Sequence, residues 1–296
     1  RCSTPAVHDA RLDAAQMTPE AAAELEVLEL DLFIEAMLRR YGYDFRDYGR
    51  ASLLRRVRNL VQKQGASSIA DLTARILHAP ELLGDMIANL SVPVSEFFRD
   101  PTTFLALKTH VFPMLASYPQ ITIWQAGCAR GEEVYSLAIL LKEASLLPRC
   151  RIFATDISKA SLSHAQDGIF PLSDMRDASR RYLESGGSQS LSAHFHARYD
   201  FARLDRSLVE NVTFAEHNLA TDGVFCEAHL VLCRNVMIYF NDQLQARVLK
   251  LARETLVRGG FLCVGERENL LDVAHGFRRV EGTAALYRVS RAAAEP

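Results

Sequence analysis

Two adjacent glutamates follow a glycine-containing turn in the stretch WQAGCARGEEVYS, Trp124–Ser136. A turn of this kind, leading from a strand into a helix, is the general element of nucleotide-binding folds, and Gly127 and Gly131 provide it here. In a dinucleotide site the helix N-terminus faces a pyrophosphate, which Glu132 and Glu133 would repel. The pair instead suits a ligand with a positively charged amino group and no phosphate, such as S-adenosylmethionine. The alternative is that both glutamates only complement the helix dipole.

A single carboxylate ends the next predicted strand, in RIFATDIS. Asp156 lies 25 positions after Gly131. At the tip of a second strand, an acidic side chain can accept hydrogen bonds from both hydroxyls of a ribose. The alternative is that Asp156 caps the following helix, a role that Ser158 fills equally well. Taken with the turn and the acidic helix start, Asp156 favours an adenosyl cofactor over NAD.

A polar pair interrupts the apolar stretch HLVLCRNVMIYFND. We predict a central strand over His229–Phe240, buried on both faces. Arg234 and Asn235 fall where this strand emerges at its carboxyl end, and ligands of open parallel sheets bind outside that edge. The alternative is that Arg234 makes an internal salt bridge and Asn235 caps a turn. Asn241 is a good cap for the helix that follows.

Alternating strand and helix patterns from about residue 120 must position these side chains. Such alternation predicts a parallel sheet with helices on both faces. The predicted strands are Ile121–Gln125, Arg151–Ile157, Val212–His217, His229–Phe240, Gly260–Gly265 and Ala284–Val289, and the predicted helices are Glu132–Leu147, Ser158–Asp167 and Asn241–Val257. The segment 169–210 breaks the alternation and indicates a small insertion.

The first part of the chain has a purely helical pattern. Residues 1–27 are rich in Ala and Glu with weak periodicity, and we expect a frayed, flexible or helical tail. Residues 28–90 predict a small helical domain with helices Asp31–Tyr41, Arg50–Gln64, Ser68–His78 and Pro80–Ala88. Residues 91–119 then form a linker and a cofactor-contacting helix, and residues 120–296 form the α/β domain.

Composition restricts the class of protein. The chain has 296 residues, a formal net charge of −2, 49% hydrophobic and 24% charged residues. The balanced charge predicts no overall attraction to nucleic acid or membrane, so a charged partner must be recognised by a local patch. No apolar run approaches the ~18 residues of a membrane span. The six cysteines form no CxxC pair, and we expect them to be small buried residues in a reducing cytoplasm.

These blocks resemble the chemotaxis receptor methyltransferases (CheR), which methylate glutamate side chains of chemoreceptors. The resemblance covers about residues 30–290, and its blocks follow the family's order: SEFFRDP (Ser95–Pro101), AGCARGEEVYS (Ala126–Ser136), ATDIS (Ala154–Ser158), HNL (His217–Leu219) and CRNVMIYF (Cys233–Phe240). It implies an α/β fold. Its parts are a Rossmann-like S-adenosylmethionine-dependent methyltransferase domain, an N-terminal all-α domain and a small inserted β subdomain, for which the segment 169–210 is the candidate.

The resemblance also implies site residues, with no metal among the cofactors. Cofactor contact is implied for Ser95, Arg99, Gly127, Glu133, Asp156, Asn218, Leu219, Arg234 and Asn235. Arg99 and Tyr239 match residues near the transferred methyl group. A glutamate nucleophile is already ionised at pH 7, so the reaction needs alignment and removal of water rather than a base. Without the family, SEFFRDP has a plainer interpretation, in which Arg99 pairs with Asp100 on the surface.

Three positions depart from the family pattern. Pro93 stands where Asn is common, and Arg130 where a small Ser or Thr is usual. A long cation at residue 130 must turn to solvent or crowd the site. GERE, Gly265–Glu268, replaces the more usual Gly-x-Ser-Glu. We expect these changes to affect cofactor affinity more than the type of reaction.

A basic helix predicts the partner surface. In RASLLRRVRNLVQKQ, Leu53, Val57 and Leu60 belong to one apolar stripe, and the expected basic outer face consists of Arg55, Arg56, Arg58 and Lys63. The family implies that this face docks on the Glu-rich methylation region of a receptor. The alternative is an ordinary solvated face. We expect a cytoplasmic monomer that binds no nucleic acid and does not insert into membranes.

Two other functions compete with glutamate methylation. Methylation of a small carboxylic acid is disfavoured by the basic helix and the extra helical domain. An S-adenosylmethionine-binding regulatory or scaffold module without turnover is disfavoured because Arg99 and Tyr239 are both present, although Pro93 and Arg130 keep it open.

Overall fold

The N-terminal helices pack around an apolar centre to which each contributes one buried stripe. The computed structural model describes residues 18–91, 95–268, 270 and 276–290. The helices of this domain are α1 (Pro19–Tyr41), α2 (Arg50–Lys63), α3 (Ile69–His78) and α4 (Leu83–Leu90). Phe33, Leu53 and Val57 are fully buried between them. The tail expected over residues 1–27 is part of α1 from Pro19 onward, because the Thr18 hydroxyl caps that helix.

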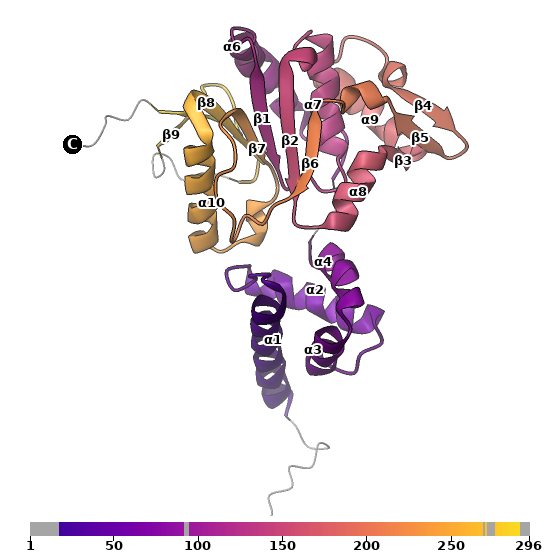
Figure 1. Cartoon of the computed structure of the whole chain (residues 1–296), viewed down its shortest axis with the longest axis vertical. Helices are drawn as coiled ribbons and strands as arrows, with labels where there is room; N and C mark the ends of the chain where they lie inside the picture. The colour runs from indigo at the N-terminus through magenta and orange to yellow at the C-terminus, as the bar shows by residue number, and fades with distance from the viewer. Residues whose placement is uncertain (1–17, 92–94, 269, 271–275, 291–296) are drawn as a thin grey trace, which may run out of the picture.

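The second domain is built on a twisted sheet with helices on both faces (Figure 1). Its seven described strands have the order β6-β2-β1-β7-β8-β10-β9, and the pairings from β6 to β8 are parallel. The strands are β1 (Ile121–Ala126), β2 (Cys150–Asp156), β6 (Val212–Glu216), β7 (Ala228–Cys233), β8 (Leu256–Val264), β9 (Phe277–Arg279) and β10 (Leu286–Val289). The helices are α5 (Pro101–Ala106), η3 (Leu107–Val111), α6 (Phe112–Leu115), α7 (Glu132–Glu143), α8 (Lys159–Asp167) and α10 (Asp242–Thr255).

The side-chain alternation of the strands explains the two covered faces. Ile123 points into the core formed with α7, whereas its neighbour Trp124 points into the core formed with α10. The predicted α/β architecture is therefore confirmed. No helix in the described ranges is long and apolar enough to cross a membrane.

The predicted insertion is a small subdomain with its own sheet. It contains β3 (Ile169–Pro171), α9 (Leu172–Glu184), β4 (Phe195–Arg198) and β5 (Phe201–Leu204). These strands pair antiparallel in the order β3-β5-β4.

The strand predicted over His229–Phe240 is wrong in its second half. β7 ends at Cys233, because its pairings to β1 and β8 end at Leu232 and Cys233. The following residues form a loop and a single 3₁₀ turn, η7 (Met237–Tyr239). The predicted cap is confirmed, since the Asn241 side chain accepts a hydrogen bond from the N–H of Leu244 at 2.9 Å. The short strand β9 was not predicted.

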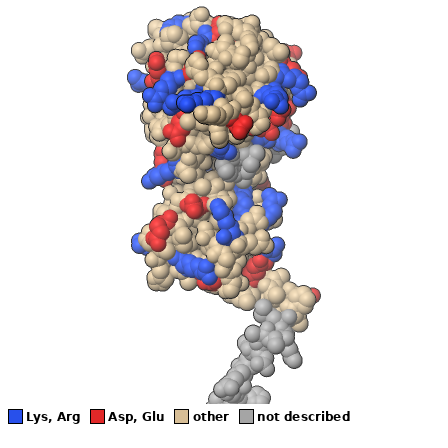
Figure 2. Space-filling model, turned by 90° about the vertical axis from the view of Figure 1, so that its right-hand side faces the viewer, with Lys and Arg blue, Asp and Glu red and all other residues tan. Residues whose placement is uncertain are grey.

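The helical domain is attached at the edge of the sheet where the parallel strands end. The Gly49 N–H donates to the Tyr239 carbonyl at 2.8 Å, and the Asn241 N–H donates to the Asp47 carbonyl at 2.9 Å. Between these bonds, the rings of Tyr48 and Phe240 meet edge to face with centroids 5.0 Å apart. The molecule narrows between the two domains (Figure 2), and these contacts bridge that narrow region.

Candidate active site

A pocket that is partly open to solvent lies between the strand tips and the helical domain. Segments that follow β1, β2, β6 and β7 supply one side, and residues of the helical domain supply the other. The lining includes every residue predicted for cofactor contact or catalysis: Ser95, Arg99, Gly127, Glu133, Asp156, Asn218, Leu219, Arg234, Asn235 and Tyr239. The fold therefore brings together residues that are up to 144 positions apart, from Ser95 to Tyr239, at the edge where open parallel sheets bind ligands.

Asp156 is held at the tip of β2 by the turn that follows β1. Its carboxylate accepts hydrogen bonds from the N–H groups of Ala129 and Ser158, both at 2.9 Å. Burial raises the pKa of this carboxyl, and the two backbone bonds oppose that rise. The helix-capping alternative is not needed, because the Ser158 hydroxyl itself caps α8 by accepting from the Ser161 N–H at 3.2 Å.

Glu133 enters the pocket from the first turn of α7 and is paired with Arg234. The Arg234 Nη1 donates to Glu133 Oε2 at 2.6 Å, and Nη2 donates to the Arg99 carbonyl at 2.8 Å and to Asp100 at 3.0 Å. The side chain of Arg234 is 0% exposed, and its guanidinium forms these hydrogen bonds with other residues of the same chain. The internal salt bridge of the alternative interpretation is therefore present, and contact of Arg234 with a cofactor stays a prediction, because this residue also lines the pocket.

The expectation that both glutamates of the turn face a ligand is wrong for Glu132. This side chain is buried but is absent from the pocket lining. Burial raises the pKa of Glu132 to about 7, with a hydrogen bond to Ser95 among the opposing effects. Successive residues of a helix point about 100° apart, so only Glu133 can face the pocket.

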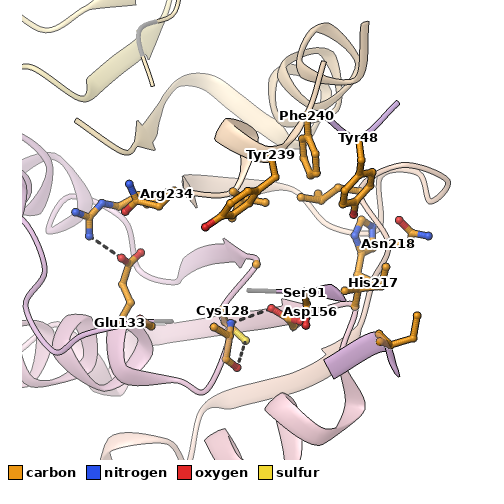
Figure 3. A pocket seen from close by; sticks show the side chains of 18 of the residues that line it. Tyr48, Ser91, Cys128, Glu133, Asp156, His217, Asn218, Arg234, Tyr239 and Phe240 are labelled. Atoms are coloured by element: carbon orange, nitrogen blue, oxygen red, sulfur yellow. Dashed lines mark hydrogen bonds and ion pairs between the residues drawn. The ribbon is translucent and has the colours of Figure 1, made fainter. Parts of the chain in front are cut away.

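Tyr239 lies across the pocket from the two carboxylates (Figure 3), and an arginine of the helical domain lies over its ring. The Arg56 guanidinium is centred 4.5 Å from the centroid of the Tyr239 ring, within the range of a cation–π contact. The same guanidinium donates to the Ser52 hydroxyl at 2.8 Å and to the Leu90 carbonyl. Arg56 is 8% exposed, so its expected place on the outer basic face of α2 is wrong.

Sequence reasoning missed Arg56 and the aromatic side of the pocket, which includes Tyr48 and Phe240. A signal for Arg56 was present, because it stands three residues after Leu53 and four before Leu60 and so shares their face. The aromatic residues carry no local signal, since their role depends on contact between the two domains.

Two family models match this chain. One is described as the all-alpha domain of CheR methyltransferases and matches residues 28–91, and the other as their SAM-binding domain and matches residues 93–286. The chain belongs to the CheR methyltransferase family. This CheR protein is thus an S-adenosylmethionine-dependent methyltransferase.

Individual relatives agree with this assignment. A protein of Pseudomonas putida named Cher3 is 45% identical over 254 residues, which cover 86% of this chain and 92% of that protein. A chemotaxis protein methyltransferase of Listeria monocytogenes is 28% identical over 244 residues, covering 82% and 90%. One of Salmonella typhimurium is 30% identical over 203 residues, covering 64% and 65%.

The pocket of this CheR protein fits an adenosyl group that carries an amino acid. Two carboxylates, Asp156 and Glu133, lie on one side of it, with the turn at Cys128 between them (Figure 3). Ile157 and Leu219 add apolar surface for a base. Gly127, with φ of +70°, is required because a Cβ there would lie 2.5 Å from the Val236 side chain. No group of three or more side chains suited to a metal ion occurs in the described ranges.

The departures from the family pattern have different consequences in the structure. Arg130 turns away from the pocket and contacts His164 of α8, so it does not crowd the site. Pro93 lies outside the described residues. Between residues 91 and 119, the lining comes from Ser91, Ser95 and Arg99, which precede α5. The described lining residues of this region thus precede α5, and the cofactor-contacting helix stays a prediction.

The outer basic face of α2 keeps Arg55, Arg58 and Lys63. Arg55 is exposed, and Arg58 makes a two-pronged contact with Glu26 of α1, one bond being 2.6 Å. Lys63 donates to Asn89 at 3.2 Å. On the side shown in Figure 2, basic and acidic side chains are mixed over both domains, so any recognition by charge must be local.

Proposed function

We propose that this CheR protein transfers the methyl group of S-adenosylmethionine to glutamate side chains of chemoreceptor-type signalling proteins and forms glutamate methyl esters. The observation that carries this proposal is the shared pocket of Asp156, Glu133, Arg99 and Tyr239. Two of these residues suit the cofactor, and the other two suit a carboxylate acceptor. The names of the Listeria and Salmonella relatives, both chemotaxis protein methyltransferases, support this choice.

Each side of the pocket has a distinct task in this proposal. Asp156 accepts hydrogen bonds from the ribose hydroxyls, and Glu133 attracts the amino group. The other cofactor contacts come from Ser95, Gly127, Asn218, Leu219 and Asn235. Arg234 acts through Glu133, which it holds in place by the 2.6 Å bond.

The bound cofactor supplies a methyl group on a sulfonium. One oxygen of the glutamate carboxylate bonds to the methyl carbon while the carbon–sulfur bond breaks, and no proton moves. Arg99 steers the carboxylate, and the Tyr239 hydroxyl orients it by a hydrogen bond. Opposite charges disappear in this step, so exclusion of water by Tyr48, Phe240 and the other aromatic residues favours the reaction. Arg99 must bind the carboxylate loosely, because tight binding would stabilise the reactant.

The partner is recognised by the outer basic face of α2, now defined as Arg55, Arg58 and Lys63. A Glu-rich helical bundle, such as a receptor methylation region, has the complementary charge. We place the reaction in the cytoplasm, with a monomeric enzyme.

Calorimetry followed by methyl transfer tests the proposal. S-adenosylhomocysteine should bind the full chain with one site. Radiolabelled methyl groups should then pass from S-adenosylmethionine to the cytoplasmic fragment of a chemoreceptor and be released by mild alkali, as esters are. Tight binding without transfer to any receptor fragment would instead favour a sensing or scaffold module.

A further inference from the structure

The buried carboxylate of Glu268 accepts hydrogen bonds from backbone N–H groups in and beside the active-site loop, which we define as residues 234–240. Glu268 Oε2 accepts from the N–H of Asn235 at 2.8 Å and from that of Gly265 at 2.7 Å. Its Oε1 accepts from the N–H of Ile238 at 3.2 Å. Glu268 is 7% exposed and does not line the pocket. Its contacts therefore act on the loop and not on a ligand.

The active-site loop needs such an anchor because it has left the sheet. β7 ends at Cys233, so the next N–H groups have no neighbouring strand to bond. Asn235 also has φ of +58°, a conformation that residues other than glycine seldom adopt. Buried N–H groups without partners are costly, and hydrogen bonds to a charged carboxylate are stronger than those to a carbonyl. Glu268 supplies this acceptor at both ends of the loop's first turn.

Gly265 makes room for the anchor. A Cβ at this position would lie 2.5 Å from the Asn235 Nδ2 and 2.9 Å from Glu268 Oε2. The first and last residues of GERE thus act as one unit, and the glycine permits the approach that the glutamate uses. This accounts for a motif to which the cofactor pocket itself assigns no role.

We infer that Glu268 is a positioning residue for methyl transfer. It fixes the backbone at Ile238, directly before Tyr239, and so sets where the phenol enters the pocket. The ring of Tyr239 is supported separately by the Arg56 guanidinium at 4.5 Å. The inference rests on the proposed function for its kinetic test, but the hydrogen bonds that carry it can be tested without turnover.

The kinetic test uses Glu268→Gln in the full chain, because this change keeps the shape and removes one acceptor oxygen. We expect kcat at saturating S-adenosylmethionine to fall about 30-fold, as for a misplaced reacting group. The Kd of S-adenosylhomocysteine should change much less than kcat, because Asp156 and Glu133 are untouched and only the contact from Asn235 is disturbed. Ser68→Ala, which removes the cap of α3, controls for general loss of stability and should leave kcat unchanged.

A double-mutant cycle shows whether Glu268 acts through Tyr239. In a Tyr239→Phe background, Glu268→Gln should lower kcat less than about threefold, because the effects of two coupled substitutions do not add. An equal loss in both backgrounds, or wild-type kcat in the single variant, overturns the inference. If the wild-type chain transfers no methyl group at all, the proposed function fails, and the test below still decides the role of Glu268.

Amide hydrogen exchange provides that second test. In the wild-type chain, the amide protons of Asn235, Ile238 and Gly265 should exchange as slowly as those in the middle of α10. In Glu268→Gln, at least one of the three should exchange about tenfold faster or more. Exchange in the wild type at the rate of an exposed loop would overturn the inference, even if the variant failed to fold.

Discussion

Two neighbouring arginines of α2 have opposite surroundings. Arg55 is exposed, whereas Arg56 is buried against Tyr239 and bonded to Ser52. Their charges are the same, so charge alone did not decide their places. Arg56 shares the helix face of Leu53, and that face is the one covered by the rest of the molecule. One basic helix thus serves both the pocket and the outer surface.

The same division occurs in the other domain, at the start of α7. Glu133 faces the pocket and pairs with Arg234, whereas Glu132 is buried away from it. In both pairs, adjacent residues of one charge have different tasks because a helix turns by about 100° per residue. A change at one member should therefore have effects that the same change at its neighbour lacks.

The largest expected effect is that of Arg56→Met. The change removes the cation above the Tyr239 ring and leaves the Leu90 carbonyl without its donor. We expect kcat/KM to fall about 100-fold and the Kd of S-adenosylhomocysteine to rise about tenfold, measured by calorimetry. The matched variant Arg55→Met should leave that Kd unchanged. A similar Kd for both variants would contradict the division of α2 into two faces.

Charge reversal on the outer face should have the next largest effect. We expect Arg55→Glu combined with Arg58→Glu to lower receptor-fragment methylation about 30-fold at low salt, because like charges then meet at the interface. The Kd of S-adenosylhomocysteine should stay the same.

A charge-matched control is Lys250→Glu with Arg258→Glu, since both residues are exposed on the other domain. This control should retain methylation. Equal losses of methylation in the two double variants would show that the outer face of α2 is not part of the interface. The effect would then come from the overall charge of the protein.

The glutamate pair should differ in its effect on pH-dependent stability. Burial raises the pKa of Glu132 to about 7, so the folded state binds a proton that the unfolded state releases at lower pH. The resulting stabilisation is present below about pH 4.5 and is lost as the pH rises through 7. Glu132→Gln removes this dependence. We expect urea unfolding to show the variant gaining about 2–3 kcal/mol over wild type between pH 5 and pH 8.

The exposed Glu281 provides the comparison for this measurement. Glu281→Gln should show no such gain over the same pH range. A constant difference between Glu132→Gln and wild type at both pH values would contradict the raised pKa.

Salt should have the smallest effect. It should distinguish receptor docking on the outer face of α2 from cofactor binding in the pocket without any mutation. Raising NaCl from about 0.05 to 0.5 M shortens the screening length well below 10 Å. We expect receptor methylation to fall about fivefold at low fragment concentration. The Kd of S-adenosylhomocysteine should hardly change, because Glu133 and Arg234 are shielded by protein. Equal salt dependence of both measurements would argue against a buried cofactor site.

Local sequence patterns were enough to predict the parallel sheet and the strand tips that carry the site. Asp156 was found because a strand pattern ends there, and Asn241 because capping depends on few neighbours. The buried face of Arg56 could have been read from its spacing to Leu53 and Leu60, whereas the place of Tyr48 depends on how the two domains meet, which no local pattern encodes. The end of β7 depends on where its partner strands stop, so an apolar stretch up to Phe240 misled the strand prediction.

A crystal structure of the full chain with S-adenosylhomocysteine tests the central claim most directly. We predict that the ribose hydroxyls contact Asp156, that the amino group faces Glu133, and that the sulfur points toward Arg99 and Tyr239 under Arg56. A ligand bound elsewhere would contradict the account. So would a sulfur more than ~10 Å from both Arg99 and Tyr239, which is beyond any hydrogen-bond reach.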